Sequence, residues 1–262
     1  MNFLSCALCP RLCRHVCPVA WGTGREAATP TMLATMQVLA ARNLVSKEEA
    51  DASASLCTDC GACAEHCHNG NPLSDWLREA RVRDHVAEDF PAVAGEGPVL
   101  LITSDQREVA GALARRLERG VATLFLPDGV GLEGLSKKKR AVRVGAFRTL
   151  CEAREVIVTD GAVASALDEA LIPWRWLHEI LNVEKSMMET CHDGSASHLC
   201  CGAREPLRSA HPATAAQMAK RFAEETRGGL CADVRCATHL RSCGVDVTDI
   251  VDVLVAGERD GK

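Results

Sequence analysis

The sequence predicts a multidomain protein, in which an all-helical domain is followed by an α/β, cysteine-rich domain made of two repeated halves. Three observations predict this fold class. Residues 1–88 have helical apolar spacing and no strand-like alternation, short apolar runs alternate with amphipathic segments from residue 99, and residues 158–181 match residues 231–254 without a gap. We therefore expect the helical domain at residues 1–95 and the two halves of the second domain at 96–185 and 186–262.

The composition indicates an ordinary globular chain of 262 residues, with 47% hydrophobic residues, 25% charged residues and a net charge of -5. This charge gives no basic footprint for nucleic acid. No apolar run reaches the roughly 18 residues of a membrane span. Eight of the fifteen cysteines lie in metal-type runs, and the first residues do not resemble a secretory signal. We expect a cytoplasmic protein that neither binds nucleic acid nor inserts directly into a membrane.

Two runs of four cysteines organise the first domain. One run has the spacing C-x2-C-x2-C-x3-C, and the other has C-x2-C-x3-C-x3-C followed by Pro18. Such runs hold [4Fe-4S] clusters, and the fourth cysteine of a run usually ligates the other cluster. We therefore assign Cys6, Cys9, Cys13 and Cys67 to one cluster, and Cys57, Cys60, Cys63 and Cys17 to the other. A zinc ribbon is the alternative, but zinc favours two pairs of cysteines.

The segments around these runs predict helices in order. Thr29 is placed to cap a helix that has Pro30 at its first position, and Asn43 is placed to stop it. Ser46 and Glu49 form a capping box for a helix that runs toward Cys57. A third helix is expected from Ser74 as cap to about Val86. His66 and His68 are alternative ligands, although solvent-facing loop positions suit them better.

Strands and helices alternate after a linker at residues 90–98. Strands are expected at Val99–Thr103, Val121–Leu126 and Glu155–Thr159, with a helix at Asp105–Arg119, which favours a parallel sheet. Residues 129–134 match G-x-G-x-x-G, but the preceding Pro-Asp-Gly indicates a turn rather than a dinucleotide loop. Residues 137–140 are a basic run of the kind that usually forms a solvated face.

Only the second copy of the internal repeat has a cysteine that could ligate a metal at the matched position. At an offset of 73 residues Asp160 matches Asp233, while Val163 matches Cys236, and each copy reads as strand, loop, helix and second helix. The alternative is a chance match between two αβ units. Residues 98–185 should therefore keep the fold and bind no metal. In the second copy a helix is expected at Pro212–Thr226, and the isolated Cys151 and Cys243 are expected to be structural.

With these residues in view, the chain resembles the heterodisulfide-reductase-like iron–sulfur proteins. Within that family it resembles the iron–sulfur subunits of glycolate oxidase, anaerobic glycerol-3-phosphate dehydrogenase and lactate-utilization enzymes. The motif Leu199-Cys-Cys-Gly202 resembles the signature of their CCG domain. The family normally carries two such halves, and the interval of eight residues between Cys191 and Cys200 is shorter than in its pattern. The metal ligands that the resemblance implies are Cys191, Cys200, Cys201 and Cys236, with Cys231 or Asp233 as substitutes.

The resemblance implies an electron-transfer subunit that carries two [4Fe-4S] clusters and a third cluster, or zinc, at the CCG site. Its partner would be a flavoprotein or a ferredoxin within a hetero-oligomer. No nucleophile–base pair is evident in the sequence, so no catalytic residue is predicted and the cofactors would carry the chemistry. The alternative is a structural or regulatory metal-binding protein, with zinc or vestigial thiols at the CCG site.

Overall fold

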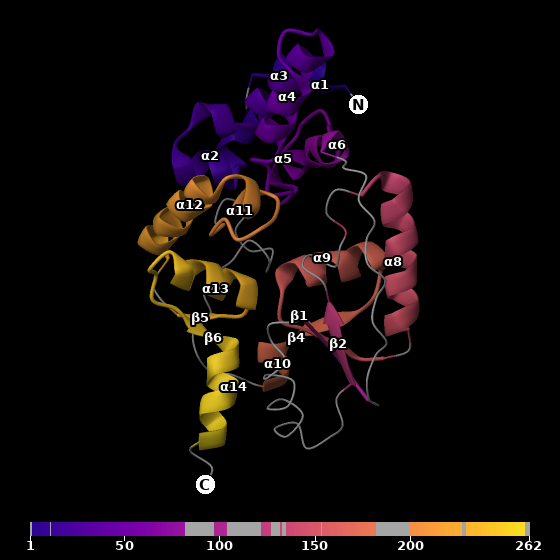
Figure 1. Cartoon of the computed structure of the whole chain (residues 1–262), viewed down its shortest axis with the longest axis vertical. Coiled ribbons are helices and arrows are strands. Elements are labelled where there is room, and N and C mark those ends of the chain that lie inside the picture. Colours follow the sequence, from indigo (N-terminus) through magenta and orange to yellow (C-terminus); the bar gives the residue numbers. More distant parts are fainter. Residues whose placement is uncertain are drawn as a thin grey trace. The chain divides into compact units, whose positions relative to one another are not determined.

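The computed structural model describes residues 2–10, 12–81, 97–103, 122–126, 132, 135–152, 154–181, 200–226 and 229–259 (Figure 1). The chain forms two compact units. The first contains residues 1–84, 189–227 and 239–245, and the second contains residues 85–188, 228–238 and 246–262. The units differ from the three consecutive domains expected from the sequence, because residues 189–227 join the N-terminal residues in one unit. None of the described helices is long and apolar enough to cross a membrane.

The first unit is helical. Its helices are α1 (Phe3–Ala7), α2 (Pro18–Thr23), α3 (Pro30–Ala41), α4 (Lys47–Ala54), α5 (Ala62–Glu65), α6 (Leu73–Ala80), α11 (Leu207–Ala210) and α12 (Pro212–Glu225), with short 3-10 helices at Leu12–Val16 and Glu26–Ala28. The expected helical character of residues 1–95 is confirmed over their described part, which ends at residue 81.

Two of the three predicted helix starts are confirmed. The Thr29 side chain accepts a hydrogen bond from the Met32 amide at 3.4 Å, and Ser46 and Glu49 form both bonds of a capping box. The third prediction is wrong, because α6 starts at Leu73 after Pro72 and makes no side-chain cap bond. Ser74 lies within the first turn of α6 and is buried, so it has left the cap position.

The core of the first unit joins both of its sequence segments. Leu33, Leu56 and Leu77 pack in one cluster with Leu207 and Met218. Helix α12 lies beside α2 (Figure 1). Gly22 permits this approach, because a Cβ atom at this position would lie 2.9 Å from Cγ of Met218. The segment that follows the Cys-Cys-Gly motif is thus part of the helical unit.

The second unit contains a parallel four-stranded sheet with the order β2-β1-β3-β4. The strands are β1 (Val99–Thr103), β2 (Ala122–Leu126), β3 (Val156–Val158) and β4 (Trp174–Trp176). Alternate residues face opposite sides: Val99 and Leu101 pack in one core cluster, and Leu100 packs in another. The three predicted strands and their parallel pairing are confirmed, while the helix expected at residues 105–119 lies outside the described residues.

The remaining elements of this unit are α8 (Lys137–Cys151), α9 (Gly161–Ala170), α10 (Leu177–Leu181), β5 (Leu230–Cys231), α13 (Val234–Ser242), β6 (Thr248–Asp249) and α14 (Ile250–Arg259), with the last residues of α13 counted in the first unit. Strand β5 pairs with β6 in a second parallel sheet. The order strand, helix, strand, helix thus occurs twice, and the starts of α9 and α13 are 73 residues apart. The sequence missed β4 and β6, because strands of two or three residues are too short to show alternation.

Matched aspartates link the two copies. Oδ1 of Asp160 accepts a hydrogen bond from the Val163 amide at 3.3 Å, and Oδ1 of Asp233 accepts one from the Cys236 amide at 3.0 Å. The second oxygen of each carboxylate bonds the other copy: Asp233 accepts from the Gly161 amide at 2.8 Å, and Asp160 accepts from Nε of Arg235 at 2.8 Å. Each carboxylate therefore caps its own helix start and holds the neighbouring one.

Candidate metal centres

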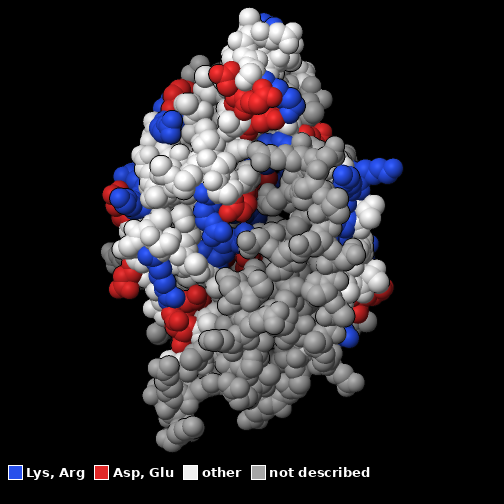
Figure 2. All heavy atoms as spheres, viewed as in Figure 1, with Lys and Arg blue, Asp and Glu red and all other residues white. Residues whose placement is uncertain are grey.

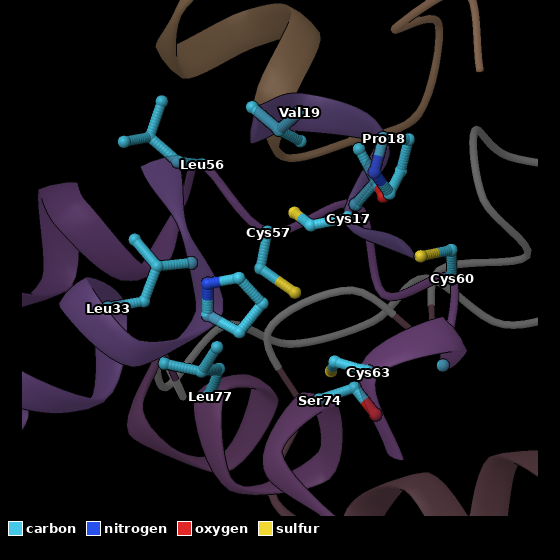
Figure 3. A pocket seen from close by; sticks show the side chains of 13 residues that line it. Cys17, Pro18, Val19, Leu33, Leu56, Cys57, Cys60, Cys63, Ser74 and Leu77 are labelled. Atoms are coloured by element: carbon cyan, nitrogen blue, oxygen red, sulfur yellow. The ribbon is translucent and has the colours of Figure 1, made fainter. Parts of the chain in front are cut away.

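The eight cysteines of the two runs line two cavities in the first unit. The outer cavity has a volume of about 190 Å³, and the inner cavity, seen in Figure 3, has about 20 Å³. The outer cavity is lined by Cys6, Cys9, Cys13 and Cys67, and the inner cavity by Cys17, Cys57, Cys60 and Cys63. Each cavity thus receives at least one cysteine from the other run, and the assignment of the eight cysteines to two clusters stays a prediction. Cys63 also lines the outer cavity, so the two cavities share a wall.

Local structure explains how each run curls around its cavity. Cys6 lies on α1, and Cys17 is the extended N-cap residue of α2, which Pro18 begins. Between Cys60 and α5, Gly61 has a φ of 76°, in the left-handed region that favours glycine. This turn brings Cys63, on α5, back toward Cys60. Short helices and tight turns therefore aim the thiols inward.

The inner cavity is lined by apolar side chains besides its four thiols. Leu33, Leu56 and Leu77 line it with the four cysteines (Figure 3). Burial raises the pKa of the Cys17 thiol to about 12 and holds the pKa of Cys57 well above its ordinary value. Burial, followed by the charge of Cys60, also raises the pKa of Cys63.

The outer cavity is lined by more polar groups, including the exposed His66 and His68. Burial is also the main cause that raises the pKa values of Cys6 and Cys13. Asn71 holds both cysteine runs here: its amide donates to Sγ of Cys67 at 3.3 Å, and its Nδ2 donates to Sγ of Cys6 at 3.5 Å. Cysteine spacing does not predict this role, because Asn71 lies outside both runs.

The donor sets fit iron–sulfur clusters. Each cavity has four soft thiol ligands, which iron–sulfur clusters favour. Desolvated thiolates are costly unless a positive charge compensates them, and iron would supply that charge. The inner cavity has room for little more than a water molecule, so its four thiols would have to turn outward to admit a cluster. Among the residues that the structure describes, no three His, Cys, Asp or Glu side chains are gathered closely enough to hold a single metal ion.

The predicted CCG ligands fall in different places. Cys191 lies outside the described residues, Cys200 and Cys201 are buried in the first unit, and Cys236 is buried in the second. Cys236 lies in the first turn of α13, where the sequence expects a helix start. The site formed by these four cysteines stays a prediction.

The substitute ligands are engaged by the backbone. Both carboxylate oxygens of Asp233 accept amide hydrogens, and the Cys231 thiol donates to the Asp233 carbonyl at 3.2 Å. Cys151 is buried, as its expected structural role requires, and burial raises the pKa of its thiol to about 11. Cys243 lies about 4 Å from the His239 ring.

Cys200 belongs to the surroundings of the inner cavity. It is 1% exposed and packs in the same core cluster as Cys17, Cys57 and Cys63. The pKa of Cys60 is raised mainly by burial, and a Cys200 thiolate would raise it further. The start of the Cys-Cys-Gly motif therefore lies near the inner cavity, a proximity that cysteine spacing alone does not predict.

Comparison with known proteins assigns the cysteine-rich part of the chain. A known domain family, the 4Fe-4S dicluster domain, matches residues 2–71, which contain all eight cysteines of the two runs. No curated protein and no solved structure matches the chain. The protein is therefore an iron–sulfur protein with a dicluster domain at its N-terminal end.

Proposed function

We propose that the protein is an electron-transfer subunit that holds one [4Fe-4S] cluster in the outer cavity and a second in the inner cavity. The observation that carries this proposal is the shared wall at Cys63. The pKa of Cys63, raised first by burial, is raised further by charges on Cys60 and Cys17 of the inner set and Cys13 and Cys6 of the outer set. When bound, such clusters supply one-electron transfer.

The chain separates the two sites by their access to solvent. His66, His68 and Pro10 of the outer cavity are exposed, whereas apolar leucines enclose the inner one. We assign electron exchange with a partner to the outer side, because a donor or acceptor can approach it there. The partner would be a flavoprotein or a ferredoxin in a hetero-oligomer.

The cluster in the inner cavity would exchange electrons with a metal site at the Cys-Cys-Gly motif. Cys200 lies in the core cluster that surrounds the inner cavity. In this proposal Cys200 and Cys201, together with Cys191 and Cys236, hold a third metal site that ends the path. Of the two consecutive copies in the second unit, only the second copy would then supply a ligand to this site, Cys236.

On the face shown in Figure 2, the described residues include side chains of both charge signs. Acidic and basic side chains are interspersed there with large uncharged areas. A partner approaching this face would meet both signs, so association there would depend on local charge matching rather than on the net charge of -5.

The test is the metal content and the redox response of the full-length protein purified without oxygen. We expect at least about eight irons with matching acid-labile sulfide, and EPR signals from two interacting clusters on reduction. Mixing with reduced ferredoxin or a reduced flavoprotein should bleach the visible absorption. Zinc without sulfide would contradict the cluster proposal, while bound clusters that neither partner class reduces would contradict the electron-transfer role.

The full-length chain is the right material for this experiment. Residues 200–226 share a core with the N-terminal helices, so a fragment ending near residue 95 would expose that core. A Cys200→Ser, Cys201→Ser double variant is the matched control for a third site. It should retain about eight irons if the two cavities hold the dicluster. The iron lost from the variant, relative to the wild type, measures the third site.

A further inference from the structure

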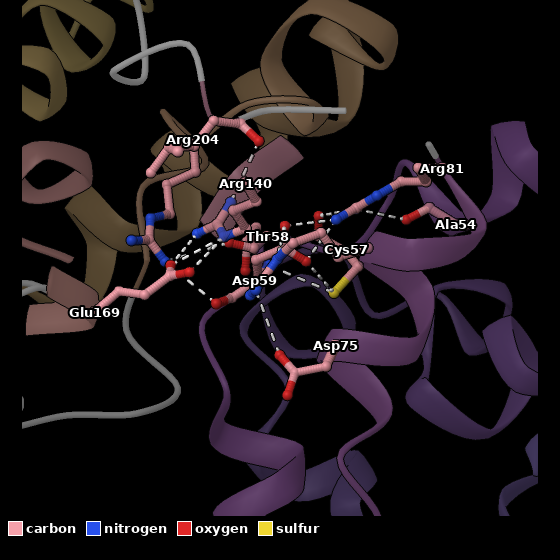
Figure 4. A network of polar contacts seen from close by, with 11 residues as sticks. Ala54, Cys57, Thr58, Asp59, Asp75, Arg81, Arg140, Glu169 and Arg204 are labelled. Carbon is pink, nitrogen blue, oxygen red and sulfur yellow. Dashed lines mark hydrogen bonds and ion pairs between the residues drawn. The ribbon is translucent and has the colours of Figure 1, made fainter. Parts of the chain in front are cut away.

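The loop between Cys57 and Cys60 contains a carboxylate that arginines enclose (Figure 4). Nη2 of Arg81 donates to both oxygens of Asp59, at 2.6 Å for Oδ1, and Nη1 donates to the carbonyls of Ala54 and Cys57 at 3.0 Å each. Arg81 is only 7% exposed, so this contact is shielded from solvent. Buried charge-assisted contacts of this kind are stronger than those at the surface.

The same contact fixes an unusual backbone conformation. Asp59 has a φ of 55°, in the left-handed region that residues other than glycine rarely adopt. In this conformation the Asp59 amide donates to Sγ of Cys57 at 3.4 Å. Arg81 therefore contacts both residues that form this hydrogen bond: it donates to the carbonyl of Cys57 and to the carboxylate of Asp59. Hydrogen bonds to ligand sulfur are among the levers that set a cluster's reduction potential.

The loop also creates a charge conflict that Arg81 offsets. Here Cys57 is a thiol that donates to Oδ1 of Asp59 at 3.5 Å. As a cluster ligand Cys57 would be a thiolate, and two anionic groups would lie that close together. Arg81 lies against the carboxylate, with Nε of Arg78 3.5 Å away. Arg204 donates to the Thr58 and Asp59 carbonyls at 3.4 Å. The negative charges of Asp59 and of a Cys57 thiolate would thus be offset by the guanidinium groups of Arg78, Arg81 and Arg204.

We propose that Arg81 is a positioning residue for the cluster of the inner cavity: it neutralises Asp59 beside the Cys57 thiolate and keeps the Asp59 amide bonded to that sulfur. The inference rests on the proposed function for the presence of the cluster. It adds that the residue which sets this cluster's retention and potential lies outside the cysteine motif. Removing the cation should weaken the cluster and shift its potential to more negative values, because added negative charge disfavours reduction.

The experiment compares Arg81→Gln, Asp59→Asn and the double variant in the full-length protein. Arg81→Gln should lose up to about four of eight irons, or keep them with a more negative midpoint potential in an EPR-monitored titration. The double variant should regain the iron, because the carboxylate whose charge Arg81 offsets is gone. Asp59→Asn alone should keep both clusters and shift the inner midpoint to more positive values. Arg81→Lys should lie between the wild type and Arg81→Gln.

Asn71→Ala is the matched control, because Asn71 contacts the sulfurs of Cys6 and Cys67 at the outer cavity. It should change the other EPR signal. If Arg81→Gln leaves iron content and both midpoints unchanged, or if the double variant is no better than Arg81→Gln, the charge-compensating role is wrong. Wild-type protein without clusters would instead contradict the proposed function. If the clusters are intact but no partner reduces them, the electron-transfer role is wrong, while the effect of Arg81 on iron content and midpoint potential can still be measured.

Discussion

Gly202, the glycine of the Cys-Cys-Gly motif, should be the least replaceable of the left-handed glycines that the structure describes. Its φ is 86°, and a Cβ atom would lie 3.0 Å from both Cα and O of Ala215 on α12. The left-handed conformation costs a residue with a side chain about 1–2 kcal/mol. Overpacking against a rigid backbone adds about 1–3 kcal/mol. Gly202→Ala should therefore reduce the free energy of unfolding by about 2–5 kcal/mol.

Gly244→Ala is the matched control for this prediction. Gly244 has a φ of 79°, and nothing lies within 4 Å of its Cβ position. It should lose only the conformational part, about 1–2 kcal/mol. Urea unfolding followed by far-UV circular dichroism measures both variants, and their midpoints are compared because a two-unit chain need not unfold in one step. Equal losses for the two variants would refute the assigned close approach of Gly202 to α12.

Two further changes test the local interactions of the first unit. Thr29→Ala should cost about 1 kcal/mol in urea unfolding, since it removes the side chain that caps α3; no change in midpoint would contradict the cap. Burial would raise the pKa of Glu205, but hydrogen bonds from Ser209 and the charge of Arg208 outweigh it and lower that pKa below the usual 4.5. The lowered pKa means that the ionised Glu205 carboxylate stabilises the folded state above pH 4.5, and this stabilisation is lost as the pH falls further. The Glu205→Gln variant should therefore lose less stability than the wild type between pH 5 and 3. Equal losses of stability for the variant and the wild type over this pH range would contradict the prediction.

The sequence predicts most of what depends on local chemistry. The cap residues at Thr29 and Ser46 locate two helix starts, while the eight ligands that the cysteine spacing indicates stay a prediction. The serine at position 74 predicts a cap two residues beyond Pro72, which occupies the cap position of α6 in the structure. Signals of this kind reach only a few residues along the chain.

The contacts that the sequence does not reveal join residues far apart in the chain. Arg81 lies 22 residues from Asp59, and Arg204 lies 145 residues from it. Nothing in the pattern around an exposed-looking arginine indicates a buried partner. The joining of residues 200–226 to the N-terminal core has the same cause, because apolar spacing predicts that α12 has a buried face but not what covers it.

We propose that the fourth cysteine of each run ligates the cluster held by the other run, and cysteine-to-serine variants test this by EPR. Cys17→Ser and Cys60→Ser should alter the same cluster signal, since both residues line the inner cavity. Cys67→Ser and Cys9→Ser should together alter the other signal, since both line the outer cavity. If Cys17→Ser instead affects the signal that Cys9→Ser affects, each run holds its own cluster and the assignment is wrong.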